Sequence, residues 1–251
     1  ELVSRLKEKA GIVKYPTGLT LACPTSEKNF AGNLPFGSYY FMDGNNYFGI
    51  FWRGEDGTQD FDLSFLDENG HKIGWNAGYN RDGKVIFSGD MTSANPDATE
   101  VLYFKGASDI HGTLWINRYY GSEGSKFRYF LGKENIGELT MNYAVDPNSI
   151  VFSEWSESKE RQQMLGIVYR NRIYPCNFSI GNAKVCSSFS ESDKFAVMTR
   201  KLNSSINLRE VLSEAGFTEY VPGKKDADGN EILPDYDLTE LSKDTLIKLF
   251  S

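Results

Sequence analysis

Tight-turn motifs recur along the first half of this chain, and they constrain its fold more than any other feature. Four of them fall at Asp43-Gly44-Asn45-Asn46, Glu55-Asp56-Gly57, Asp67-Glu68-Asn69-Gly70 and Arg81-Asp82-Gly83. Asn-Gly and Asp-Gly pairs between alternating apolar residues are the strongest local signal for a β-hairpin. Short strands at this spacing indicate packed antiparallel sheets and not a βαβ fold. We therefore expect a mainly β protein, an antiparallel β-sandwich over residues 38–185.

The pattern changes toward the C-terminus. Asn207-Leu208-Arg209-Glu210 and Asp237-Leu238-Thr239-Glu240 each have a capping side chain followed by an acid three residues later. This spacing is typical of a helix start. We expect a helical extension over residues 186–251, and a short helix or linker with its lead-in over residues 1–37.

Composition narrows the function classes. The net charge of −7 argues against general nucleic-acid binding, because contact with phosphates needs a basic surface. No apolar run approaches twenty residues, so we expect no transmembrane segment. Cys23, Cys176 and Cys186 match neither a disulfide framework nor a zinc spacing. Buried free thiols in a reducing compartment are the simplest interpretation, and the cytoplasm is the expected location.

Two acidic segments are candidates for one site. In Asp60-Phe61-Asp62-Leu63-Ser64-Phe65, residues spaced by two share a strand face, so the two aspartates point one way and the apolar side chains the other. A second segment begins at Ser88-Gly89-Asp90 and continues to Asp97 and Glu100. Carboxylates are the ligands that Ca²⁺ prefers. We predict a Ca²⁺ site centred on Asp60, Asp62 and Asp90, with Asp97 and Glu100 as further contributors. The alternative is that these acids are solvated surface.

Taken as a whole, the stretch from Gln59 to Phe104 resembles the core of the TerD-like tellurium-resistance and stress proteins. The paired aspartates, the Asp67-Glu68-Asn69-Gly70 hairpin and Ser88-Gly89-Asp90 carry this resemblance. It implies a calcium-binding β-sandwich that works in a cytoplasmic stress-response or defence system. The acidic run of that family is thinned here to Asn95-Pro96-Asp97-Ala98-Thr99-Glu100, so one cation site is weakened or lost.

Three functions remain open from the sequence. The favoured one is a non-enzymatic Ca²⁺-binding interaction module whose C-terminal helices contact a protein partner. A second is a carbohydrate-active or other hydrolytic enzyme that uses Asp60, Asp62 and Glu100, with sugar platforms at Trp52, Trp75 or Trp115. The third is a purely structural interaction domain without metal. We expect no enzyme, because neither His71 nor His111 lies in a catalytic motif.

Overall fold

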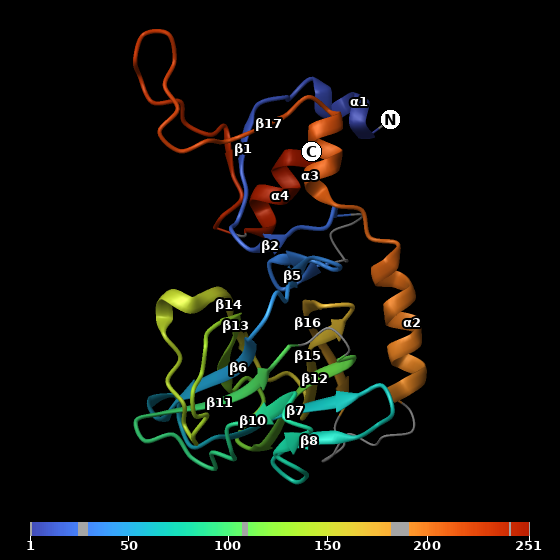
Figure 1. The fold of residues 1–251 in the computed structure, drawn as a ribbon, viewed down its shortest axis with the longest axis vertical. Helices are drawn as coiled ribbons and strands as arrows, with labels where there is room; N and C mark the ends of the chain where they lie inside the picture. The colour runs from blue at the N-terminus through green and yellow to red at the C-terminus, as the bar shows by residue number, and fades with distance from the viewer. Residues whose placement is uncertain (1, 25–29, 107–109, 182–190, 241, 251) are drawn as a thin grey trace.

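Two antiparallel β-sheets form the body of the protein in a computed structural model of the chain (Figure 1). The structure describes residues 2–24, 30–106, 110–181, 191–240 and 242–250. The expected mainly β fold, with helices toward the C-terminus, is confirmed.

The first sheet has the strand order β14-β13-β6-β11-β10-β9. Strand β6 pairs with both β11 and β13, so it is a central strand, whereas β14 pairs only with β13 and is an edge strand. The strands are β6 (Asn46–Arg53), β9 (Asn80–Arg81), β10 (Val85–Phe87), β11 (Asp97–Phe104), β13 (Lys126–Lys133) and β14 (Ile150–Glu157).

The second sheet has the strand order β2-β5-β16-β15-β12-β7-β8. Strand β7 pairs with β12 along its whole length, but β8 covers it only from Ser64 to Leu66. The strands are β2 (Leu19–Thr20), β5 (Tyr39–Phe41), β7 (Asp60–Asp67), β8 (Lys72–Gly74), β12 (Gly112–Tyr120), β15 (Gln162–Tyr169) and β16 (Arg172–Gly181). A separate small hairpin pairs β3 (Phe30–Ala31) with β4 (Leu34–Pro35).

Aromatic side chains fill the space between the two sheets. The rings of Trp52 and Phe61 lie 5.8 Å apart, and those of Phe65 and Phe104 lie 5.7 Å apart, each pair joining one sheet to the other. All four side chains are fully buried. Because side chains alternate along a strand, this packing turns the odd-numbered residues of β7 inward and its even-numbered residues to the outer face.

The outer face of the second sheet is covered by helix α2 (Glu191–Asn203) (Figure 1). Leu202, Phe195 and Met198 of this helix pack against buried residues of the sheet, among them Trp115. The indole N–H of Trp115 donates to Thr113 Oγ1 at 2.7 Å. Every strand of the second sheet that α2 covers is therefore buried on both faces.

The two ends of the chain meet in one small unit, which we call the end unit. Strand β1 (Ile12–Lys14) lies between β17 (Thr218–Glu219) and β18 (Tyr236–Asp237) and is parallel to both. Helices α1 (Leu2–Lys7), α3 (Leu208–Glu214) and α4 (Lys243–Phe250) complete it (Figure 1). The expected boundaries at residues 37/38 and 185/186 stay predictions, and the second of them lies outside the described residues.

One expected helix start is confirmed and the other is wrong. Asn207 caps α3, since its side chain accepts a hydrogen bond from the Arg209 N–H at 2.9 Å. Asp237 instead ends β18, where its carboxylate accepts the N–H of Thr239, and α4 begins only at Lys243. An aspartate that caps the backbone two residues on makes a turn as readily as a helix start.

Two further expectations concern membrane-spanning segments and the state of the cysteine thiols. None of the described helices is both long and apolar enough to span a bilayer. Cys23 and Cys176 are buried free thiols, as expected, and Cys186 lies outside the described residues.

Candidate metal centre

Strand β7 supplies two carboxylates to the candidate site. Phe61 and Leu63 take the inward positions of this strand, so Asp60 and Asp62 point to the other face of the sheet. Asp60 is only 7% exposed and Asp62 only 2% exposed. The alternative that these aspartates form a solvated strand face is therefore wrong.

The third carboxylate comes from the loop between β10 and β11. Ser88 fastens this loop to β11 twice, because its N–H donates to the Val101 carbonyl and its hydroxyl accepts the Val101 N–H, both at 2.9 Å. Gly89 follows with φ of 117°, a conformation that favours glycine. The chain then presents Asp90 to β7. One carboxylate oxygen from each of Asp60, Asp62 and Asp90 lies within 4.8 Å of the others.

Burial and mutual repulsion make these three carboxyl groups hard to ionise. Burial raises the pKa of Asp60 to about 6, and the charge of Asp90 adds to the effect. Burial also raises the pKa of Asp62 to about 7, against the opposing influence of its hydrogen bond from Asn117. The pKa of Asp90 is raised by burial as well. A cation among the three would reverse all three shifts, since it favours the ionised forms.

Three buried oxygens at this site accept no hydrogen bond from the described residues: Oδ1 of Asp60, Oδ1 of Asp90 and Oδ1 of Asn117. Asn117 lies opposite Asp62 on β12, and its Nδ2 donates to Asp62 Oδ2 at 3.0 Å. Buried oxygens are nearly always paired, so this concentration of unpaired ones calls for a partner. Oxygen-only donor sets suit hard cations such as Ca²⁺ and Mg²⁺.

The sequence does not predict Asn117 as a site residue, because no motif in the residues around it indicates a role in binding. Its place beside Asp62 depends on the pairing register of β12 with β7, two strands far apart along the chain. No local pattern encodes that register.

Glu100 lies beside the cluster but has a different role. It is fully buried, its Oε2 accepts the Leu63 N–H at 2.6 Å, and its Oε1 accepts the Met91 N–H at 2.8 Å. Burial raises its pKa well above the ordinary value, although both backbone hydrogen bonds favour the ionised form. Asp97 begins β11 opposite Arg53 and is not one of the three clustered residues. The structure thus brings together Asp60, Asp62 and Asp90 of the five residues predicted.

The tryptophans and histidines considered for enzyme chemistry lie in different parts of the fold. Trp52 is buried between the two sheets and Trp115 is buried beneath α2, so neither ring is exposed to a sugar. His71 contacts Asp67 at 3.1 Å and His111 contacts Glu68 at 3.2 Å, both next to the hairpin that follows β7. Trp75 stacks at an angle on Tyr119, with 5.6 Å between their rings, and the ammonium of Lys72 lies 5.1 Å from its ring.

No protein-family model matches this chain, and no curated protein or solved structure that was compared with it matches either.

Proposed function

We propose that Asp60, Asp62 and Asp90 bind a Ca²⁺ ion, and that the protein is a non-enzymatic calcium-binding interaction module. One observation carries this proposal: two buried carboxylates and a half-buried one lie within 4.8 Å of one another, and two of the three have a buried oxygen without a hydrogen bond from the described residues. Three negative charges at that separation repel unless protons or a cation neutralise them.

We favour calcium over magnesium because the carboxylates come from a strand and a separate loop. Ca²⁺ takes oxygen ligands at about 2.3–2.6 Å, so two ligands on opposite sides of the ion can lie about 5 Å apart. Mg²⁺ needs about 2.0–2.1 Å and near-ideal octahedral geometry. Carboxylates drawn from a strand and a separate loop, and not from one preformed octahedral cage, suit the larger and more tolerant ion.

Ion binding would act on the loop that carries Asp90. Without a cation, ionised Asp60 and Asp62 would repel the carboxylate of Asp90. A bound ion would attract all three carboxylates instead. The loop would then be held in one shape, and its outer surface could serve as a calcium-dependent contact for a partner.

We further propose that the partner is a protein and that the setting is a cytoplasmic stress-response or defence system. The resemblance of residues 59–104 to TerD-like proteins supports the setting. Exposed apolar side chains of the end unit support a protein partner: Val221 is 54% exposed and Leu233 is 69% exposed, both in the long β17–β18 connection. Figure 1 shows this connection extending away from the rest of the fold.

Hydrolysis by the carboxylate pair is the less favoured alternative. Two of its three sugar platforms, Trp52 and Trp115, are buried, and Glu100 is engaged by two backbone N–H groups. The interaction domain without metal remains the competing function, and the calcium experiment separates the two.

The test is a calorimetric Ca²⁺ titration of the metal-free protein, followed by thermal melts with Ca²⁺ and then with chelator. A ligand that binds only the folded state at one hundred times its Kd stabilises by about 2.7 kcal/mol, which raises Tm by several degrees. We expect that rise in the wild type and in Asp228→Ala, a control in an exposed loop. Asp62→Ala and Asp90→Ala should remove it. A wild-type Tm that changes neither on adding calcium nor on adding chelator would contradict the proposal.

A further inference from the structure

A cavity of about 590 Å³ opens beside the edge strand β14, and none of the residues that line it belongs to the aspartate cluster. Strands β13 and β6 separate β14 from β11, the strand that follows the Asp90 loop. Ligand-binding cavities usually hold about 300–1,000 Å³, so this one has room for a small organic molecule of two or three rings. Nothing in the proposed calcium function uses it.

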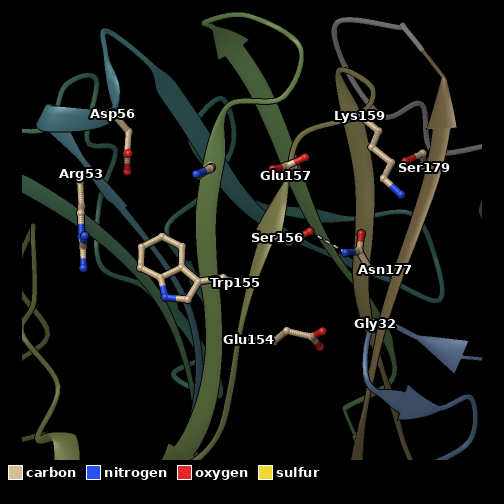
Figure 2. A pocket seen from close by; sticks show the side chains of 11 residues that line it. Gly32, Arg53, Asp56, Glu154, Trp155, Ser156, Glu157, Lys159, Asn177 and Ser179 are labelled. Carbon is tan, nitrogen blue, oxygen red and sulfur yellow. Dashed lines mark hydrogen bonds between the residues drawn. The ribbon is translucent and has the colours of Figure 1, made fainter. Parts of the chain in front are cut away.

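Trp155 provides a large flat surface on one side of this cavity. It is 43% exposed, although tryptophan normally buries most of its ring. Its orientation is fixed by two neighbours on the outer face of the first sheet: the guanidinium of Arg53 lies 5.1 Å from the ring, and the Phe51 ring meets it edge-on at 6.1 Å. Figure 2 shows Trp155 directed toward Arg53.

Hydrogen-bonding groups of both kinds line the other side. Figure 2 shows Ser156, Glu154 and Asn177 on the side of β14 away from Trp155. Asn177 is held by two hydrogen bonds, donating to Ser156 Oγ at 2.6 Å and accepting from Gln163 Nε2 at 2.9 Å. A polar side chain held in this way needs no reordering when a ligand arrives.

The charges around the cavity cancel. Arg53, Lys126 and Lys159 line it together with three acids, Asp56, Glu154 and Glu157. Among the described residues, the side chains of Lys126, Lys159, Asp56 and Glu157 form no ion pair or hydrogen bond with one another or with other groups. The site thus offers free donors and free acceptors with no net attraction for either sign of charge.

An extended peptide pairing with the β14 edge fits less well. The N–H of Asn33 donates to Glu154 Oε1 at 3.1 Å, and a Cβ placed on Gly32 would meet that carboxylate, so the β3–β4 turn lies against the middle of the edge. The Glu157 carbonyl already accepts Gln163 Nε2 at 3.2 Å. Strand addition needs a run of free backbone groups, and this edge leaves only a short one.

From these features we propose that the cavity is a binding site for a neutral oligosaccharide. The apolar face of one sugar ring stacks on Trp155, and the hydroxyls of the next ring reach the polar groups around Ser156 and Asn177. Hydroxyls donate and accept, which matches a lining that supplies free carboxylates, ammonium groups and an ordered amide. The site binds sugar without cleaving it, and it works independently of calcium.

Calorimetric titration with cellotetraose, maltotetraose and chitotetraose tests the proposal on the full chain. We expect at least one of these probes to bind, with quenching of tryptophan fluorescence, equally in calcium and in chelator. Trp155→Ala should weaken binding about tenfold or more, and Asn177→Ala should weaken it severalfold. Tyr119→Ala, which removes an exposed aromatic side chain from the second sheet, should leave it unchanged. Thermal melts of each variant check that the fold is intact.

Three results would overturn the inference. One is the absence of binding by all three probes at millimolar concentration. Another is binding that Trp155→Ala leaves unaltered, which would put the sugar elsewhere. The third is a clear preference for sulfated or sialylated glycans, or for peptides from a random library, since either contradicts a neutral sugar as the ligand.

Discussion

The Glu100 carboxylate of β11 accepts the backbone N–H of Leu63 in β7, with 2.6 Å between Oε2 and N, and so joins the two sheets of the sandwich. Strand β8 pairs with β7 only from Ser64 onward, so no strand covers Leu63 on that side. The second oxygen of the same carboxylate holds Met91, the residue after Asp90. Glu100 therefore positions both parts of the aspartate cluster without belonging to it.

Replacing Glu100 by alanine should lower the free energy of unfolding by about 2–4 kcal/mol, because two buried N–H donors lose their acceptor at about 1–2 kcal/mol each. Glu100→Gln keeps one acceptor oxygen, so its loss should be smaller. Urea denaturation measures both, with Thr99→Ala on the same strand as the control. If Glu100→Gln removed the calcium response at unchanged stability, Glu100 would be a ligand after all.

The stability of the metal-free protein should fall as the pH rises from about 4 to about 7. In this window the folded state keeps protons on Asp60 and Asp62, whose pKa values are raised to about 6 and about 7, while the unfolded chain has already lost them. The folded state thus binds more protons than the unfolded state, and each step up in pH favours unfolding.

Thermal melts between pH 5 and pH 8 measure this dependence, and the double variant Asp60→Asn/Asp62→Asn is its control. The fall in Tm should be steeper in the wild type than in the double variant. With saturating Ca²⁺ the wild-type slope should flatten or reverse, because the ion competes with protons for the same oxygens. Equal slopes in the two metal-free proteins would contradict the assignment of the shifts to these carboxyls.

Asp62→Asn should stabilise the metal-free protein at pH 8 by on the order of 2 kcal/mol, since it removes a buried charge and one pKa unit corresponds to about 1.4 kcal/mol. The amide oxygen can still accept the hydrogen bond from Asn117. Chemical denaturation gives the value. Asp97→Asn, outside the cluster, should change neither the stability nor the calcium response. A destabilised Asp62→Asn would show that the buried charge of Asp62 is not the main cost at this site.

Leu249→Ala should destabilise the protein by about 2–5 kcal/mol, as expected for a leucine truncated in a tight core. Leu249 is fully buried in α4 and belongs to the same continuous core as Val13 of β1. Differential scanning calorimetry should show the loss of stability. The control variant Asp244→Ala, at an exposed position of α4, should keep the wild-type stability. A Leu249→Ala protein with wild-type stability would mean that α4 contributes little to the end unit.

Local patterns were enough to predict the sandwich. Two kinds of feature depend only on neighbouring residues and can be recognised from the sequence alone. They are the hairpin turns, such as Asp67-Glu68-Asn69-Gly70, and the alternation from Asp60 to Phe65. The same is true of the Asn207 cap. The Asp237 motif misled because a capping carboxylate satisfies a turn and a helix start equally well, and only the pairing of β18 with β1 distinguishes them.

The sequence by itself determined that Asp60 and Asp62 share a strand face, because that follows from the period of a β-strand. Tertiary structure decided the rest of the site. The register of β12 with β7 places Asn117 beside Asp62. The hydrogen bonds between Ser88 and Val101 position the loop that brings Asp90 to β7. Glu100 lies on the inward face of β11 and so reaches the backbone of Leu63. Burial raises the pKa values of the aspartates. The sequence could not show this, because desolvation depends on what packs around a side chain and not on its neighbours in sequence.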